Sequence, residues 1–546
     1  MKIILSSIQL MSYNMLICAE KVFFRETLTL IGLISAGVTL FIPLNTVSCK
    51  GEWILREYIT GAMLKAALKE QGLFMDSSRD FDETIIYGIS QDSRETEPGS
   101  IFICKGKNFR EEYLLHSRQR GAVCYAACEN YYIDMPHIQV SDDRKALAVA
   151  SKLFYLRGEK PLKTAVITGT KGKTTACYML RSMAASSGVK CAFSSTVELF
   201  DGNRSKAATL TTPESIELYR LMATAAKNGC ELMITEASSA AFGMDRIYGI
   251  NIDCGVFLNI TPDHISSYEH KSFRDYYMCK FGIMRSAKKA GICVDDDFGR
   301  VMAAKLKKEG KEVMTFSGGN FEADIMATQI IKQGSASSVT IRYPGGVTKF
   351  KIGMAGEYNI QNALGAFCAA YLLGLDIKED CLENLCVPGR MEVIEGREVT
   401  VVVDYAHNKV SMASVLKALR EQYPGRDIRV VFGCSGNKVP RRRMDMAYES
   451  AEYAKEVIIT DDNPAFEDSA EIARRIASYL EERHCDYLIE YDRAKAIELA
   501  VIRARRGDII LIAGKGREKF QRIKGVVYPY EGDISAAKRA LLTQGK

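Results

Sequence analysis

The stretch Gly169-Thr170-Lys171-Gly172-Lys173-Thr174-Thr175 decides the fold class of this chain. It follows the apolar, β-branched run Thr164–Thr168, which is typical of a buried strand, and precedes apolar residues at helical spacing from Tyr178 to Met183. A glycine-rich turn between a strand and a helix lets backbone N–H groups surround a phosphate, and the helix dipole favours negative charge there. The pattern predicts a phosphate-binding loop in an α/β domain; a glycine-rich turn without a ligand is the alternative.

Two loop side chains and two later residues predict a metal–nucleotide centre. Lys173 is expected to reach the β- and γ-phosphates, and the Thr174 hydroxyl to bind Mg²⁺. Glu236 and His264 each follow an apolar strand, and ligands of open α/β sheets lie beyond the carboxyl ends of the strands. We therefore expect both residues to face the phosphate site, where a carboxylate suits Mg²⁺ and an imidazole holds or orients a second ion.

The composition is that of a soluble globular protein. The 546 residues suffice for three domains, and 47% are hydrophobic and 26% charged. The net charge of +6 is small for this length, and no basic tract indicates a nucleic acid partner. The 16 cysteines include no C-x-x-C pair, which in a nucleotide-using chain favours reduced thiols and a cytoplasmic location.

The N-terminal segment 1–62 is open to three interpretations. Residues 28–49 carry no charge and are long enough to span a bilayer, although Pro43 and Asn45 interrupt the apolar run. The segment is a membrane anchor, a signal sequence, or upstream sequence included through a wrong start codon, with the true start at Met63. We favour the wrong start over membrane association and base no function on this segment.

We predict an α/β protein of three domains: a small α/β domain over 63–158, a central doubly wound sheet of the P-loop ATPase type over 159–387, and a Rossmann-like α/β domain over 388–546. In the second and third domains apolar runs alternate with helical patterns, which is typical of parallel sheets. The predicted elements are strands Ile85–Ile89, Ile101–Cys104, Ala122–Ala126, Ile138–Val140, Thr164–Thr168, Leu232–Thr235, Gly255–Leu258, Gly291–Val294, Val399–Val403, Ile428–Phe432, Val457–Thr460 and Asp508–Ile512, and a helix over Tyr358–Leu372.

Further motifs follow one another along the chain. They are Asp92-Ser93-Arg94, Thr211-Thr212-Pro213-Glu214, Glu236-Ala237-Ser238-Ser239, Asp263-His264, Gly356–Ala363, Val387–Glu392, Asp404-Tyr405-Ala406-His407, Asp462-Asn463-Pro464 and Gly514-Lys515-Gly516. Together with the phosphate loop they resemble the motifs of the Mur ligases, the family that adds amino acids to UDP-N-acetylmuramic acid. The resemblance runs from about Met63 to the C-terminus and is strongest with the members that add the third amino acid.

The resemblance implies that the first domain binds the UDP end of a substrate, the central domain ATP, and the third domain an amino acid. The implied ATP-binding residues are Gly169, Thr170, Lys171, Gly172, Lys173, Thr174, Thr175, Asn362 at the adenine, and Arg390 and Asp404 at the domain junction. The implied residues for the UDP-sugar-peptide are Ser93, Thr211, Thr212, Ser238 and Arg246. Those implied for the amino acid are Asp462, Asn463, Ala465, Gly514 and Glu518.

The resemblance also implies a modified lysine in the catalytic centre. Members carry a carbamylated lysine after the Asp-His pair, and Lys280 is the candidate here, beside Lys173, Glu236 and His264. Carbamylation would turn a cation into an anion that binds the second of two Mg²⁺ ions, alongside the ligands Thr174, Glu236 and His264. An ordinary exposed helical lysine is the alternative.

The implied reaction joins a free diamino acid to UDP-N-acetylmuramoyl-L-Ala-D-Glu at the expense of ATP. The acceptor carboxylate attacks the γ-phosphate to give an acyl phosphate and ADP, and the amine then displaces phosphate. Catalysis of this kind is mainly positioning and electrostatics. We expect a monomer without a stable protein partner or nucleic acid.

Several positions depart from the family pattern, and one of them, Ala465, bears on specificity. Members that take meso-diaminopimelate usually have arginine at that position, because its fork binds the second carboxylate bidentately. Alanine favours L-lysine or a similar diamino acid, because Glu518 or a neighbouring acid would accept hydrogen bonds from the ammonium at its far end. Arg517, in place of a histidine, could supply the missing guanidinium and keeps meso-diaminopimelate open. Ala240 and Asn408-Lys409 also differ from the common residues.

Other functions stay open at this point. The segment from Ser266 to His270 is longer than in common members, which indicates a harmless insertion or a divergent paralogue. A folylpolyglutamate synthetase-like ligase would lack the first domain, whereas this chain has Asp92-Ser93-Arg94 followed by Pro98–Phe102. A non-catalytic Mur-like subunit would bind nucleotide without turning it over.

Overall fold

The computed structural model describes residues 57–262, 265, 270–333, 336–437 and 440–546, together with the short strands β1 (Leu33–Ser35) and β2 (Val38–Leu40). The rest of the apolar segment 28–49 and the candidate His264 lie outside the described residues. Within the described part of the chain, no helix combines the length and the apolar character that crossing a membrane requires.

The first domain is built on a five-stranded sheet in the order β4-β9-β8-β7-β6, parallel except for β4. Its helix α2 begins at Gly61, and the Thr60 hydroxyl caps it by accepting a hydrogen bond from the Met63 N–H at 3.3 Å. The boundary predicted at Met63 therefore lies inside the first turn of α2. The elements are β3 (Ile59–Thr60), α2 (Gly61–Glu70), β4 (Phe74–Ser77), β5 (Ile85–Ile86), β6 (Gly88–Ser90), β7 (Ser100–Ile103), α3 (Glu111–Gln119), β8 (Cys124–Ala127), β9 (His137–Val140) and α4 (Asp143–Leu156).

The central domain carries an eleven-stranded sheet in the order β13-β12-β11-β14-β10-β15-β16-β17-β18-β19-β20. The strands from β11 to β18 are parallel, and helices pack apolar side chains on both faces, α5 and α10 on one and α6, α8 and α9 on the other. The elements are β10 (Lys163–Thr168), α5 (Lys173–Ser186), β11 (Cys191–Ser194), β12 (Glu198–Phe200), β13 (Ser205–Ala207), α6 (Ser215–Lys227), β14 (Leu232–Glu236), α7 (Ser239–Gly243), β15 (Cys254–Phe257), α8 (Phe273–Ser286), β16 (Lys289–Cys293), α9 (Asp297–Lys308), β17 (Glu312–Ser317), β18 (Ile325–Gln333), β19 (Ala336–Tyr343), β20 (Gly346–Ile352) and α10 (Glu357–Leu373).

The third domain has a six-stranded sheet in the order β21-β22-β26-β23-β24-β25, between α11, α12 and α13 on one face and α14 and α15 on the other. A separate hairpin, β27 and β28, follows the last parallel strand. The elements are β21 (Glu392–Glu395), β22 (Thr400–Asp404), α11 (Lys409–Gln422), β23 (Ile428–Phe432), α12 (Arg441–Tyr453), β24 (Glu456–Ile459), α13 (Ser469–Glu481), β25 (Asp486–Ile489), α14 (Arg493–Arg503), β26 (Ile509–Ala513), β27 (Phe520–Ile523), β28 (Val526–Pro529) and α15 (Asp533–Gln544).

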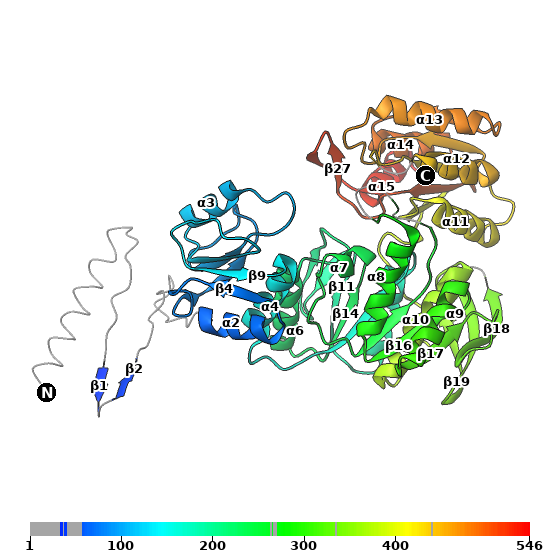
Figure 1. The fold of residues 1–546 in the computed structure, drawn as a ribbon. Coiled ribbons are helices and arrows are strands. Elements are labelled where there is room, and N and C mark those ends of the chain that lie inside the picture. The colour runs from blue at the N-terminus through cyan, green and yellow to red at the C-terminus, as the bar shows by residue number, and fades with distance from the viewer. Residues whose placement is uncertain are drawn as a thin grey trace, which may run out of the picture.

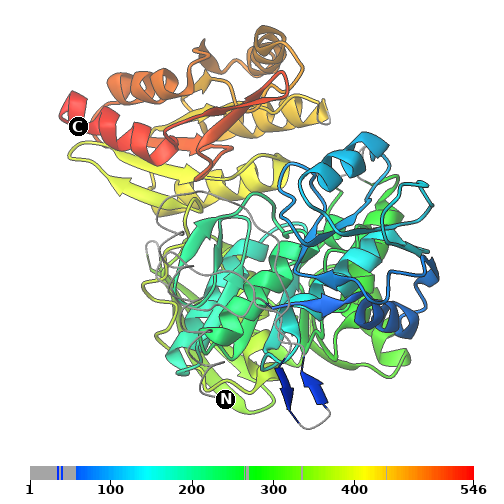
Figure 2. The same cartoon turned by 90° about the vertical axis from the view of Figure 1, so that its left-hand side faces the viewer.

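The three domains meet around the central sheet. In Figure 1 the first domain, in blue, lies beside the central domain, and the third domain, yellow to red, lies above it. The view turned by 90° shows the same order of domains, with the third again at the opposite end from the strands β1 and β2 (Figure 2). The α/β fold class predicted from the sequence is confirmed, and the strand carrying the phosphate loop, β10, lies inside the central sheet between β14 and β15.

Two parts of the fold differ from the sequence prediction. The predicted strand Ile85–Ile89 is divided, because β5 pairs with β3 while β6 joins the main sheet beside β7. The strands β18, β19 and β20 extend the central sheet as an antiparallel meander that the prediction lacks. Buried and less buried residues alternate along β19, as expected for a strand with one covered face, so it lacks the continuous apolar run that identified the parallel strands.

A buried ion pair holds the outer helices of the third domain. Arg493 at the start of α14 and Asp533 at the start of α15 have no exposed side-chain surface, and two hydrogen bonds of 2.7 and 2.8 Å join them. Arg493 also donates to the Ala513 carbonyl at 2.9 Å, which ties the pair to the end of β26.

Replacing Arg493 with methionine is expected to destabilise the third domain by about 3–5 kcal/mol, because Asp533 becomes an unpaired buried charge. Urea unfolding followed by hydrogen exchange of α14 and α15 peptides measures the loss. The double variant Arg493→Met/Asp533→Leu removes both charges and should recover most of the stability. A single variant within about 1 kcal/mol of the parent would contradict the assignment.

Candidate functional site

The phosphate loop connects β10 to α5, and its glycine at position 172 is required by geometry. Gly172 has φ 86°, and a Cβ added there would lie 2.0 Å from Asn362 Oδ1 on α10. The loop backbone is also tied to the neighbouring strand, since the Thr170 and Lys171 N–H groups donate to the Asn259 carbonyl and side chain, each at 3.0 Å. The loop is thus held open for an anion at the N-terminus of α5.

A cavity of about 450 Å³ lies over this loop, between the central and third domains, and is named the nucleotide cavity after the prediction that it binds ATP. It brings together most of the residues predicted to bind ATP and a metal and one predicted for the UDP-sugar-peptide, Thr211; His407 of the third domain also lines it. The lining residues among the predicted ones are Thr170, Lys171, Gly172, Lys173, Thr174, Thr175, Thr211, Glu236, Asn362, Arg390 and Asp404. Gly169 does not line the cavity, but its carbonyl oxygen accepts hydrogen bonds from two lysines.

Two lysines converge on the Gly169 carbonyl. Lys173 donates to it at 3.0 Å and Lys280, on α8, donates at 2.8 Å. Lys280 is 1% exposed, so it is not the surface lysine of the alternative interpretation. Two ammonium groups directed at one oxygen repel each other, and an anion beside them would reduce that repulsion.

Glu236 and Thr174 supply oxygen ligands of the kind that Mg²⁺ prefers. Glu236 is fully buried at the end of β14, and its carboxylate accepts hydrogen bonds from the Thr196 N–H at 2.8 Å and the Thr196 hydroxyl at 3.0 Å. A carboxylate has about four acceptor positions, so Glu236 keeps capacity for a cation in the cavity. A buried, cavity-facing carboxylate beside a hydroxyl fits a hard divalent ion.

Arg390 and Asp404 connect the third domain to the loop. Arg390 donates to the Thr174 hydroxyl at 3.3 Å and lies over the Tyr405 ring at 4.5 Å. Asp404 accepts from the Met391 and Ala406 N–H groups at 2.8 and 2.7 Å. Burial raises the pKa of Asp404, and the Arg390 charge and these hydrogen bonds oppose the rise. The third domain therefore contributes a cation and a shaped backbone turn to the nucleotide cavity.

The residues predicted for the UDP-sugar-peptide fall into two groups. Thr212, Ser238 and Arg246 are joined directly, because the Ser238 N–H donates to the Thr212 hydroxyl at 3.1 Å and Arg246 to the Thr212 carbonyl at 3.1 Å. Thr211 lines the nucleotide cavity next to them. Ser93 lies apart in the first domain, where its hydroxyl is 3.1 Å from His116 Nδ1.

An ion pair bridges these two groups. Lys105 of the first domain contacts the Glu214 carboxylate at 2.6 Å and the Gln91 side chain at 2.6 Å, and Glu214 also pairs with Arg246 at 2.9 Å. Burial disfavours the Glu214 anion, but the hydrogen bond from Lys105 and the two cations lower its pKa below the ordinary value. The first domain is thereby anchored close to the end of β14.

Three of the five residues predicted for the amino acid surround one buried lysine. Lys515 is fully buried and its Nζ lies 3.2 Å from Asp462, 3.1 Å from the Asn463 side chain and 3.1 Å from Glu518. Glu518 also accepts a hydrogen bond from the Tyr405 hydroxyl at 3.0 Å, so this cluster touches the same tyrosine that stacks on Arg390. The Gly514 N–H donates to the Asp404 carbonyl at 3.1 Å, which places the predicted amino-acid site next to the nucleotide cavity.

Ala465 and Arg517 differ in their surroundings. Ala465 has φ 56° and its N–H donates to the Arg522 carbonyl at 3.0 Å, so its backbone is paired with the β27 strand. Arg517 is held by Glu392 through two hydrogen bonds of 3.0 and 2.6 Å. The sequence had suggested that the Arg517 guanidinium could bind a second substrate carboxylate. In the structure this guanidinium is already bound bidentately by Glu392.

Three contributors to the site escaped sequence reasoning. Thr196 holds Glu236, Tyr276 hydrogen-bonds the Thr170 hydroxyl at 3.0 Å, and Lys105 links the first domain to Glu214. None lies in a motif, and each acts across at least 40 positions in the chain. Only the strand order, which places β11 beside β14, would have indicated Thr196.

Two family models match the chain: the Mur ligase middle domain over residues 167–370, and the Mur ligase glutamate ligase domain over residues 389–516. A UDP-N-acetylmuramyl-tripeptide synthetase of Lactobacillus delbrueckii subsp. bulgaricus is 35% identical over 503 residues, with 87% of this chain and 97% of that protein covered. The UDP-N-acetylmuramoyl-L-alanyl-D-glutamate–L-lysine ligase of Streptococcus pneumoniae is 35% identical over 489 residues, covering 87% and 98%. A solved UDP-N-acetylmuramoyl-L-alanyl-D-glutamate–2,6-diaminopimelate ligase superposes with a TM-score of 0.60 at 26% identity, covering 86% and 98%.

Replacing Gly172 with alanine is expected to weaken ATP binding at least about tenfold, because a left-handed backbone costs a residue with Cβ about 1–2 kcal/mol and the new methyl meets Asn362. Calorimetric titration of ATP measures the change. Gly188→Ala is the matched control: Gly188 has φ 75° at the end of α5, with no atom within 4 Å of an added Cβ. It should lower the melting temperature without changing ATP affinity. Unchanged ATP affinity in Gly172→Ala would remove the loop from the nucleotide site.

Proposed function

Because the chain belongs to the Mur ligase family, we propose that it is an ATP-dependent ligase that adds L-lysine to UDP-N-acetylmuramoyl-L-Ala-D-Glu as the third amino acid of the peptide. The observation that supports this most directly is the cavity between the central and third domains. It joins a phosphate loop and Glu236 on one side to Arg390 and Asp404 on the other, with the Lys515 cluster adjoining it through Tyr405. The first domain, from the start of α2 to about residue 158, would hold the UDP end.

The chain's own side chains account for the first chemical step. The acceptor carboxylate attacks the γ-phosphorus of ATP, the bond to the bridging oxygen breaks, and ADP leaves with that electron pair. Lys173 and the loop N–H groups offset charge on the phosphate oxygens, and Arg390 adds a second cation from the third domain. Mg²⁺ held by Thr174 and Glu236 would neutralise further charge on the phosphates. The adenine would lie beside Asn362.

The second step forms the amide bond. The neutral amine of the incoming amino acid attacks the acyl phosphate carbonyl, and phosphate leaves as the amine loses a proton. Asp462, Asn463, Gly514 and Glu518 would orient the amino acid, since their loops adjoin the nucleotide cavity. Their main contribution is positioning, because holding both reactants in line removes much of the entropic barrier.

Lysine is preferred to meso-diaminopimelate for an electrostatic reason. A second substrate carboxylate needs a free guanidinium, and the candidate Arg517 is already paired with Glu392 through two hydrogen bonds. Ala465 offers no charge, whereas Glu518 is an anion whose two oxygens accept hydrogen bonds from three neighbouring side chains and keep acceptor capacity for a substrate ammonium. A cytoplasmic location follows for an enzyme that uses ATP and a nucleotide-linked sugar.

Lys280 is proposed to be carbamylated. Its neutral amine would add to CO₂, forming an N–C bond and releasing one proton, so that the side chain ends in a carboxylate. That change replaces one of the two ammonium groups at Gly169 by an anion, next to Lys173 and within reach of a second metal ion.

The full-length protein is expected to release phosphate from ATP with UDP-N-acetylmuramoyl-L-Ala-D-Glu and L-lysine, with kcat/KM at least about 100-fold above that for meso-diaminopimelate. Glu518→Gln keeps the side-chain shape but removes its charge, and should lower kcat/KM for lysine about 10–100-fold. Arg517→Gln is the control and should leave the preference unchanged. Diaminopimelate turnover that disappears in Arg517→Gln would reverse the specificity, and ATP binding without turnover would indicate a non-catalytic subunit.

Removing bicarbonate is expected to lower activity, and adding it back to restore activity, if Lys280 is carbamylated. Lys280→Ala should lose at least about 100-fold in kcat, the usual cost of removing one group that stabilises transition-state charge. Isotopically labelled bicarbonate should give a carbamate NMR signal in the parent and in Lys271→Ala, an exposed lysine just before the same helix, but not in Lys280→Ala. A carbamate signal that survives in Lys280→Ala would assign the modification elsewhere.

A further inference from the structure

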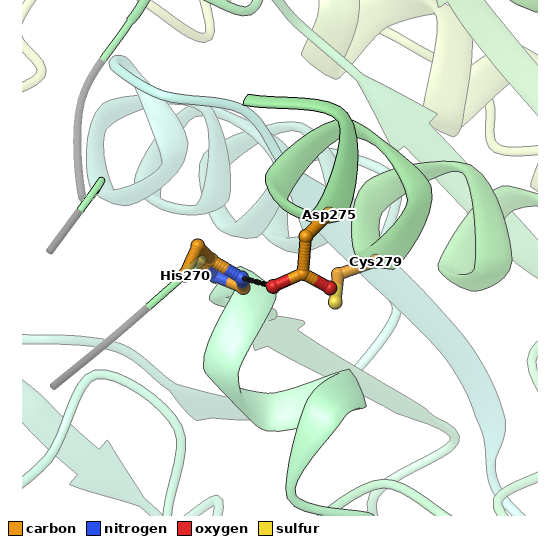
Figure 3. Close-up of side chains that lie close together, drawn as sticks. All are labelled: His270, Asp275 and Cys279. Carbon is orange, nitrogen blue, oxygen red and sulfur yellow. Dashed lines mark hydrogen bonds and ion pairs between the residues drawn. The ribbon is translucent and has the colours of Figure 1, made fainter. Parts of the chain in front are cut away.

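A second group of metal-ligating side chains lies outside the nucleotide cavity, at the start of α8. His270, Asp275 and Cys279 offer a ring nitrogen, a carboxylate oxygen and a thiol sulfur that all lie within 4.8 Å of one another. Asp275 and Cys279 are one helical turn apart on α8, and His270 precedes the helix on the same side, with the Asp275 carboxylate between the other two groups (Figure 3). The reaction proposed above uses none of these three groups.

We propose that His270, Asp275 and Cys279 form a binding site for a divalent transition metal ion of the zinc class. Nitrogen, oxygen and sulfur donors together suit zinc, whereas Mg²⁺ takes oxygen donors alone. Three protein ligands leave a fourth position, and the Asp275 side chain is 47% exposed, so water can reach it. The site is therefore of the open kind rather than a closed structural one.

The contacts of His270 fix the orientation of its ring, as is typical of metal-binding histidines. The ring is 6% exposed, its Nδ1 lies 3.0 Å from Asp275 Oδ2, and its Nε2 lies 2.7 Å from the Ser239 hydroxyl. With the ring proton on Nε2 and donated to the buried Ser239 oxygen, Nδ1 carries a lone pair, and a bound metal ion would take the place of the proton that otherwise joins Nδ1 to Asp275 Oδ2. A hydrogen bond of this kind on the second ring nitrogen fixes the orientation of metal-binding histidines.

The site is distinct from the proposed Mg²⁺ centre although the two share α8. Cys279 and Lys280 are consecutive, so their side chains leave the helix about 100° apart. Lys280 points to the Gly169 carbonyl. Cys279 lies with Asp275 and His270 on the side of the helix that faces α7, and its sulfur would be 3.6 Å from a Cβ added to Gly243 of that helix. A bound ion would tie the chain before α8 to its first two turns.

The experiment uses the full-length protein freed of metal with a chelator and then titrated with Zn²⁺ in excess Mg²⁺. We expect one tightly bound equivalent that Cys279→Ser and His270→Gln each weaken at least about 100-fold, more than the roughly 10–100-fold effect of losing an outer-shell partner. Ser239→Ala is expected to weaken it about tenfold. These readouts do not depend on ligase activity, so failure of the proposed function would leave them intact.

Co²⁺ serves as the spectroscopic probe, because a thiolate ligand gives an intense near-ultraviolet charge-transfer band. The band should appear in the parent, in Cys386→Ser, whose cysteine is exposed elsewhere on the chain, and in Glu236→Gln, which alters only the Mg²⁺ centre. It should be absent in Cys279→Ser, a near-isosteric change that preserves the fold. No tight Zn²⁺ equivalent in the parent, or the same Co²⁺ band in Cys279→Ser, would overturn the proposal.

Discussion

The Gly169 carbonyl is the point on which the proposed catalytic centre depends. It directly follows β10 in the parallel part of the central sheet, and it accepts hydrogen bonds from Lys173 on the next helix and from Lys280 on a helix more than 100 residues later. Both amines are thereby brought to the N-terminus of α5, where the helix dipole already favours anions. A phosphate group, or the carbamate proposed on Lys280, would add negative charge beside these two amines.

The division of labour between domains follows from this centre. The central domain alone holds the loop and Glu236, but Arg390 and Asp404 reach the cavity only because the third domain packs over it. The Arg390 contact with Thr174 and the Tyr405 contact with Glu518 are parts of one chain of interactions, from the loop through Tyr405 to the Lys515 cluster. Any rotation of the third domain therefore changes the nucleotide and amino-acid sites together. A ligase that must keep an acyl phosphate from water would gain from such coupling, because both substrates would then be held by the same domain arrangement.

How much of this could be predicted from the sequence depended on the range of the interactions. The phosphate loop, the strand before it and the parallel strands of the central and third domains produce local signals: glycine spacing and continuous apolar runs. The local pattern therefore predicts the turn at Gly172, but not the close approach of Asn362, which lies far away in the sequence. Thr196, Lys105 and the Arg517–Glu392 pair act between elements far apart in sequence, so no local pattern identifies them. Arg517 is an example: its guanidinium suggested a ligand for a substrate carboxylate, but in the fold that guanidinium already forms two hydrogen bonds with Glu392.

The segment before α8, which is longer than in common family members, is another case in which contacts between distant residues matter. Sequence reasoning recorded only extra residues ending at His270, whereas the fold places that histidine against Asp275 of α8 and Ser239 of α7. Both helices bear on the centre: α8 carries Lys280, and its Tyr276 hydroxyl contacts the loop residue Thr170, while Ser239 follows directly on the Ser238 that binds Thr212. A ligand gathered by His270, Asp275 and Cys279 would stiffen the two supports of the phosphate loop without entering the cavity. Its influence on catalysis would then be exerted through the position of Lys280, because that residue directly follows Cys279 on the same helix and donates to the Gly169 carbonyl of the phosphate loop.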